Sequence, residues 1–168
     1  NNNQEVTEAQ QSVDEEKMTN LLDDQSFNEQ MVGFANDVAV SLVASVSNAL
    51  VYSSQKNARV INASLGASLE NIAPGIAATF AQYGATDRDI LTIIKMFLAA
   101  AIGLTEKRLK EYSPNALMVI AAGNSSADND RELFTPANVN VDNAITVAAT
   151  FDRHALASVS NYGATKVH

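Results

Sequence analysis

The chain has 168 residues, of which 46% are hydrophobic, and this is enough apolar material for one buried core rather than two independent domains. It has no cysteine, which excludes a disulfide framework, a thiol nucleophile and a thiolate zinc site. A net charge of -8 argues against nucleic-acid binding through a basic face. We expect no membrane span, because the most apolar stretch, residues 90–104, is short and interrupted by Lys95.

An acidic segment rich in asparagine and glutamine fills residues 1–35. Residues 1–30 hold eight acidic residues, one basic residue and few large apolar side chains. Such a segment buries too little surface to offset the entropy that it loses on ordering. We therefore predict a flexible tail or loop. Two interpretations stay open: a solvated tail in which residues 18–22 dock on the body as a partial helix, or an acidic recognition segment.

Two amphipathic helices are predicted next. Apolar residues recur at three-and-four spacing from residue 36 or 37 to residue 53 or 54, which is typical of a helix with one buried stripe. A second helix is expected to open at Asn71 and Pro74, because a proline at the first helical position loses no hydrogen bond. Gly84 is a suitable end for it.

A third helix is predicted after Thr86. The spacing from Thr86 to Asp89 is that of a capping box, with Asp in place of the usual Glu or Gln, and apolar residues continue at helical period through residues 90–101. Residues 105–112 indicate a further amphipathic turn or two. That stretch should end before Pro114, since the residue preceding a proline is disfavoured in the α conformation.

Short apolar runs between these helices predict buried strands. They lie at residues 60–66, 117–122 and 145–149, and each is bounded by turn residues. Helices that alternate with such strands indicate right-handed crossovers. The expected fold class is therefore α/β with a doubly wound parallel sheet.

One motif lies where such a sheet binds ligands. In Ala121-Ala122-Gly123-Asn124 a predicted strand ends at a glycine, which lets a ligand backbone approach, and a carboxamide that donates hydrogen bonds without a charge follows it. The alternative is an ordinary turn, because Asn is common in turns.

Three blocks of sequence, in the same order, resemble the subtilisin-like serine proteases (subtilases, peptidase S8 family). They are Val60-Ile61-Asn62-Ala63-Ser64-Leu65-Gly66, Val119-Ile120-Ala121-Ala122-Gly123-Asn124, and Thr135-Pro136-Ala137 leading to Ala144-Ile145-Thr146-Val147-Ala148-Ala149. The last block continues into Ala157–Gly163, with Val159 where the family usually has an aromatic residue. The resemblance covers about residues 36–168. It implies a partial subtilase catalytic domain with a subtilisin-like sheet, incomplete and with an extra helical insertion.

The resemblance also assigns roles to individual residues. Asn124 resembles the catalytic asparagine of the oxyanion hole, which stabilises the charge that develops when a serine attacks a peptide carbonyl. The substrate-binding edge would comprise Ser64, Leu65 and Gly66, and the opposite wall of the specificity pocket Ala121, Ala122 and Gly123, whose size would leave room for a large or apolar substrate side chain. The alternatives are a turn-capping role for Asn124 and core packing for the two alanines.

The catalytic triad of the family does not occur in these 168 residues. The resembled segment lies between the catalytic His and the catalytic Ser, and no Asp-Thr/Ser-Gly, His-Gly-Thr-His or Gly-Thr-Ser-Met-Ala motif is present. We expect no substitute site from His154, His168 or Asp142 with Ser158 or Ser160.

Acidic and carbonyl groups in the second half of the chain raise the question of a cation. Residues 128–130 lack the glycine and distal glutamate of an EF-hand and are expected to form a solvated loop. Residues 137–142 match a region where some family members bind a weak cation. No cofactor or metal is expected to be required, although structural calcium in the parent protein is compatible with the resemblance.

The function implied is that of a fragment of a serine endopeptidase, which supplies the oxyanion donor and the substrate cleft but is inactive alone. One alternative is a catalytically dead subtilase-like binding or scaffolding module. The other is an unrelated ligand-binding α/β domain, disfavoured because no Gly-rich phosphate loop occurs. The expected partner is a polypeptide substrate, not nucleic acid or membrane, with self-association through exposed sheet edges. The family implies a secreted or periplasmic location.

Overall fold

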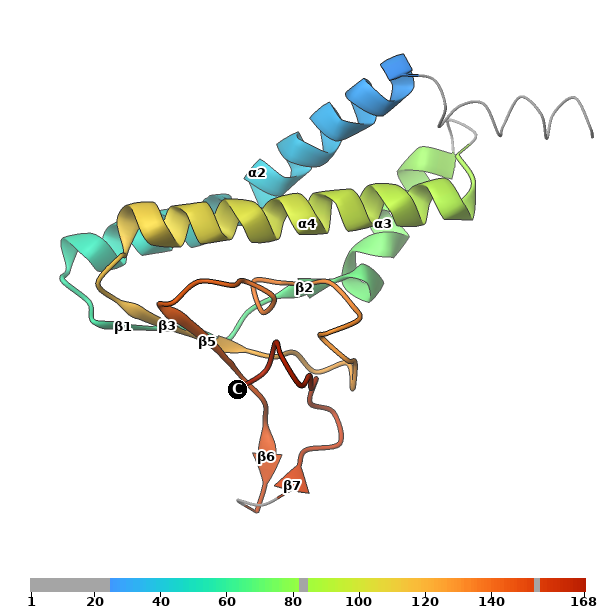
Figure 1. The fold of residues 1–168 in the computed structure, drawn as a ribbon. Coiled ribbons are helices and arrows are strands. Elements are labelled where there is room, and N and C mark those ends of the chain that lie inside the picture. The colour runs from blue at the N-terminus through green and yellow to red at the C-terminus, as the bar shows by residue number, and fades with distance from the viewer. Residues whose placement is uncertain (1–24, 82–84, 153–154) are drawn as a thin grey trace, which may run out of the picture. The chain divides into compact units, whose positions relative to one another are not determined.

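The computed structural model describes residues 25–81, 85–152 and 155–168 (Figure 1). The chain divides into two compact units, Asn1–Phe34 and Ala35–His168. Most of the predicted acidic tail, residues 1–24, lies outside the described residues. From Gln25 onward the prediction of a tail is wrong, because helix α2 spans Gln25–Gln55. Residues 25–32 contain no Gly or Pro, so extending an existing helix backward through them costs little per residue.

Helix α4 spans Asp87–Tyr112 and joins two stretches that the sequence predicted separately. Its predicted capping box is confirmed: Thr86 Oγ1 accepts a hydrogen bond from the Asp89 backbone N–H at 3.2 Å, and Asp89 Oδ2 accepts one from the Thr86 N–H at 2.9 Å. The helix ends at Ser113, directly before Pro114, as predicted.

Helix α3 spans Leu69–Ala81, so Pro74 lies inside the helix rather than at its start. Ser68 begins the helix instead, because its Oγ accepts a hydrogen bond from the Asn71 N–H at 3.4 Å. The Pro74 nitrogen lacks the hydrogen that would bond to the carbonyl one turn earlier. The predicted stop at Gly84 lies outside the described residues.

Three parallel strands form the main sheet, in the order β1-β3-β5: Val60–Ala63, Leu117–Ala121 and Ala144–Val147. Ile61 pairs with Met118 and Ala63 with Ile120, and Ile120 in turn pairs with Thr146. A parallel pair needs a crossover, which α3 and α4 supply between β1 and β3. The predicted α/β class with a parallel sheet is confirmed.

Two small antiparallel pairs complete the sheet structure. β2 (Ala67–Ser68) pairs with β4 (Phe134–Thr135), and β6 (Thr150–Phe151) pairs with β7 (Ala155–Leu156). β2 follows β1 in the chain and β4 follows β3. Their pairing therefore joins the two segments that continue beyond the carboxyl ends of β1 and β3.

The core lies between the helices and one face of the sheet (Figure 1). Leu50 of α2 and Leu109 of α4 pack with Met118 and Ile120, which alternate along β3 and are buried. On the opposite face of β3, Leu117 remains 37% exposed. The strands were predicted to be buried. In the described residues, the buried core lies on one face of the sheet only.

Helix α2 contains the one segment, among the residues described, with the length and apolarity of a membrane-crossing helix, Val32–Gln55. The prediction of no membrane span rested on residues 90–104 and did not consider Val32–Gln55. Only 22% of its most apolar window is buried, yet Ala39 and Val43 pack against Ala101 of α4. The buried stripe of this segment therefore has a protein partner.

Candidate active-site cleft

A cleft of about 310 Å³ opens at the carboxyl ends of β1 and β3. Parallel pairing of Ala63 with Ile120 brings the two strand ends to the same edge of the sheet, although they lie far apart in sequence. The cleft is lined by residues from both strand ends, from the start of α3 and from β4: Ser64, Leu65, Gly66, Asn71, Ala121, Gly123, Asn124, Ser125 and Phe134.

The two glycines of the cleft are required by close contacts. Gly123 has φ +117°, a conformation that residues with a side chain rarely adopt. A β-carbon added there would lie 2.6 Å from Asn161 Nδ2 and 2.7 Å from Phe134 Cζ, and one added at Gly66 would lie 2.8 Å from Phe134 Cε1. Neither position has room for a side chain.

Buried carboxamides hold the loop that carries Asn124. Asn161 Oδ1 accepts hydrogen bonds from the backbone N–H groups of Ser125 (2.8 Å) and Ala127 (3.2 Å). Asn161 Nδ2 donates to Asn129 Oδ1 at 3.0 Å, and Asn129 Nδ2 donates to the carbonyl of Ala122 at 2.9 Å. Asn161 and Asn129 are both almost fully buried, so these bonds fix the backbone on either side of the Gly123–Asn124 step.

Asn124 itself is exposed at the cleft. Among the residues that the structure describes, no hydrogen bond engages its carboxamide, whereas Asn129, Asn138 and Asn161 use both ends of theirs. A turn-capping Asn would bond to nearby backbone. The Asn124 N–H donors are thus free to reach a ligand in the cleft.

Five of the six residues predicted to bind substrate line the cleft: Ser64, Leu65, Gly66, Ala121 and Gly123. Ala122 does not; it is 1% exposed and donates its N–H to the Val147 carbonyl, which leaves it a packing role. Sequence reasoning missed Asn129, Asn161 and Phe134. Asn161 lay within a block quoted for the family, and Phe134 directly precedes another, but neither position has a periodicity that shows where its side chain lies.

Asp130 is exposed, as the predicted solvated loop requires, but its carboxylate is bound to another segment of the chain. Its carboxylate accepts hydrogen bonds from Thr165 Oγ1 at 2.8 Å, from the Ala164 N–H at 2.7 Å and from the Lys166 N–H at 2.9 Å. The Thr165 hydroxyl has the largest effect and lowers the pKa of Asp130; desolvation opposes it, and the backbone N–H donors of residues 164–166 lower the pKa further. Asp130 therefore fastens residues 164–166 to the segment that follows the cleft.

Two observations on the described residues bear on a cation site. No group of three His, Asp or Glu side chains suited to a metal occurs among the described residues. In residues 137–142 the carbonyls of Ala137 and Val141 and the Asn138 Oδ1 each accept a hydrogen bond within the chain, which does not fit a ready-made set of oxygen ligands. Calcium elsewhere in a parent protein stays a prediction.

Ser160 and His168, two of the residues considered for a substitute catalytic site, make hydrogen bonds to backbone groups. Ser160 Oγ accepts from the Ala149 N–H and donates to the Asn161 carbonyl. His168 Nδ1 accepts from the Thr146 N–H at 3.2 Å. His154 lies outside the described residues. The Ser160 hydroxyl and the His168 imidazole are thus bonded to backbone groups.

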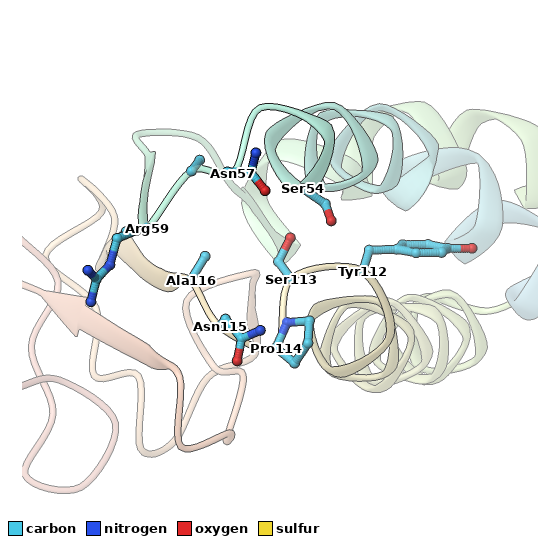
Figure 2. A pocket seen from close by; sticks show the side chains of 9 residues that line it. Ser54, Asn57, Arg59, Tyr112, Ser113, Pro114, Asn115 and Ala116 are labelled. Carbon is cyan, nitrogen blue, oxygen red and sulfur yellow. The ribbon is translucent and has the colours of Figure 1, made fainter.

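A larger hollow of about 510 Å³ lies at the opposite, amino-terminal edge of β1 and β3. Figure 2 shows Ser54 and Asn57, from the end of α2 and the turn that follows, facing the α4–β3 turn with Ser113 and Asn115. Ser113 Oγ donates to the Leu50 carbonyl, which accounts for its hydroxyl. Among the described residues, no fully buried carboxamide holds the turns around this hollow, as Asn129 and Asn161 do beside the smaller cleft, so we place the candidate site at the smaller cleft.

The cleft lies at the carboxyl edge of a parallel α/β sheet, which is where domains of this class place their ligand sites. The sequence matches the subtilase family over residues 32–167. The chain therefore belongs to the subtilase family. No protein of curated function matches it in sequence.

The chain is also similar to parts of several solved protease structures. The epidermin leader peptide processing serine protease of Staphylococcus aureus is 22% identical, with a TM-score of 0.47 over 73% of this chain and 28% of that one. The nisin leader peptidase of Lactococcus lactis is 15% identical, with a TM-score of 0.39 over 73% and 34%. A lanthipeptide protease is 16% identical, with a TM-score of 0.39 over 70% and 30%. The chain thus spans about a third or less of the length of these proteins.

Proposed function

We propose that this chain is the central part of a serine endopeptidase and that it supplies the oxyanion donor and much of the substrate cleft. The observation that carries the proposal is the free carboxamide of Asn124 at the carboxyl edge of a subtilase-family sheet. The nucleophile, its base and the carboxylate that orients the base would come from outside these 168 residues, so the chain alone would be inactive.

Asn124 would act in the transition state. When a serine attacks a peptide carbonyl, the carbonyl oxygen gains negative charge, and a neutral N–H donor held in place stabilises that oxygen. The buried Asn161 and Asn129 hold the adjoining backbone, so little reorganisation is needed when the charge develops. The extended substrate would pair its main chain with residues 64–66.

The test uses the complete reading frame that contains this chain. A fluorophosphonate probe that labels activated serines shows whether a competent protease is present, independently of substrate preference. We then expect Asn124→Leu to lower kcat about 100- to 1000-fold with little change in KM, since the bond forms mainly in the transition state. That magnitude is the one known for the equivalent loss in subtilisin itself and is adopted rather than derived.

Asn115→Leu is the matched control, because Asn115 is also exposed but lines the hollow at the opposite edge of the sheet. It should leave kcat and KM unchanged. A rise in KM alone for Asn124→Leu would contradict the assigned role. Asn124→Leu should also leave the free energy of unfolding within about 0.5 kcal/mol of the wild type, since its side chain has no partner to lose.

The second candidate is a binding or scaffolding module without catalysis, which a lack of triad motifs in the complete protein would favour. It predicts no probe labelling of the complete protein together with retained binding of an extended peptide. We also propose a secreted or periplasmic location from the family; fractionation of cells that express the complete protein tests it.

A further inference from the structure

The ring of Phe134 occupies the space between the two walls of the cleft. Its Cε1 lies 2.8 Å from a β-carbon built on Gly66, and its Cζ lies 2.7 Å from one built on Gly123. Gly66 follows β1 and Gly123 follows β3, so a single ring edge contacts both walls at once. The cleft is narrowed between its walls by this ring.

Several contacts hold the ring in this position. Phe134 lies in β4, where it pairs with Ser68 of β2, and its N–H donates to Asn138 Oδ1 at 3.1 Å. The residue is only 7% exposed and packs in the main core with Ala63 and Ile120. Swinging the ring out would expose it to water and leave a void in the core, so it does not move aside for a ligand.

The position of Asn124 shows which substrate group meets the ring. The carbonyl that Asn124 would stabilise belongs to the residue that precedes the scissile bond, so the side chain of that residue lies in the same cleft as Asn124. Gly66, Gly123 and Phe134 line this cleft together with Asn124. A long side chain entering between the two glycine walls would collide with the ring.

We propose that Phe134 is the specificity-determining residue of this cleft and restricts the position before the scissile bond to small side chains such as Gly, Ala or Ser. This inference rests on the proposed endopeptidase function. It differs from the expectation that the small residues 121–123 make room for a large or apolar side chain. The walls are small, but the Phe134 ring lies between them and shortens the space that a substrate side chain can enter.

The experiment compares peptides that differ only at the residue before the scissile bond, Ala against Phe, with the complete protein. The wild type should cleave the Ala peptide with at least about tenfold higher kcat/KM, the scale on which pocket size discriminates. Phe134→Ala should shift the ratio toward the Phe peptide by at least about tenfold. Phe134→Leu, which keeps a large apolar side chain in the core, should shift it in the same direction by less and covers the case in which Phe134→Ala does not fold.

Phe151→Ala is the matched control, because Phe151 is 74% exposed on β6 and should leave the ratio unchanged. A fluorophosphonate probe distinguishes a failure of the proposed role of Phe134 from a failure of the proposed protease function. If it labels the wild type but the Phe peptide is preferred, or if Phe134→Leu leaves the ratio unchanged, the role of Phe134 is refuted and the proposed protease stands. If the probe labels nothing, the proposed function fails and the role of Phe134 fails with it.

Discussion

The two edges of the parallel sheet differ in how their loops are built. The amino-terminal edge has the larger hollow, about 510 Å³ against about 310 Å³, and Asn57 there has φ +53°, but its turn residues are exposed or bonded to nearby backbone. The carboxyl edge has Gly123 at positive φ, two glycines in close contact with Phe134, and buried carboxamides around Asn124. Unusual backbone conformations held by buried polar groups are a better indication of a site than volume.

The largest expected effect at the carboxyl edge is that of Gly123→Ala. The added methyl group is strained at φ +117° and collides with Asn161 and Phe134, so we expect a loss of about 2–4 kcal/mol in the free energy of unfolding. Urea denaturation measures it. Gly103→Ala is the control, because Gly103 lies in α4 with nothing within 4 Å of an added β-carbon, and it should gain about 0.5–1 kcal/mol. Equal changes in the free energy of unfolding for Gly123→Ala and Gly103→Ala would show that the backbone at Gly123 is not specially constrained.

Asn161→Ala should have the next largest effect. It removes the acceptor for the Ser125 and Ala127 N–H groups and the donor to Asn129, all in a buried region, at a cost of about 1–3 kcal/mol. The same substitution at exposed Asn115 should stay within about 0.5 kcal/mol. Hydrogen exchange of the Ser125 and Ala127 amides should accelerate in the Asn161 variant. Unchanged exchange would show that the carboxamide does not hold this loop.

The smallest effect concerns Asp130 and pH. Because its pKa in the folded state lies below the ordinary value of 3.8, ionised Asp130 stabilises the fold above that pH, and the contribution is lost as pH falls through the lowered folded pKa. Asp130→Asn should therefore be less stable than the wild type at neutral pH, and the difference should shrink under acid. Urea midpoints of both proteins across this range test it. A difference that does not change with pH would show that the charge plays no part.

The sequence predicted the features that depend on local pattern. Strands β1 and β3 begin at Val60 and Leu117 as predicted, and the Thr86 capping box forms, because short apolar runs and cap spacing are local signals. It was wrong about where α3 begins, although that signal is local as well: Ser68 caps the helix three residues before Asn71, so Pro74 lies inside it.

The candidate site was predicted only in part. Glycine and asparagine at the end of a predicted strand were enough to place Gly66, Gly123 and Asn124 at one edge of a parallel sheet. The direction of each side chain was not predictable: Ala122 faces the core, and Phe134 reaches the cleft only because β4 pairs with β2. Partners such as Asn161, 37 residues after Asn124 in the chain, become visible only once the loops are folded together.

The exposed, unpartnered carboxamide of Asn124 has a consequence for how such a protein would age. A solvent-facing carboxamide is open to slow hydrolysis, in which water replaces the nitrogen, ammonia leaves and a carboxylate remains. The product would have nearly the same size but would replace N–H donors with oxygens that only accept and carry negative charge. In the proposed role, deamidation of the Asn124 carboxamide would turn the group that stabilises the developing oxyanion into one that repels it.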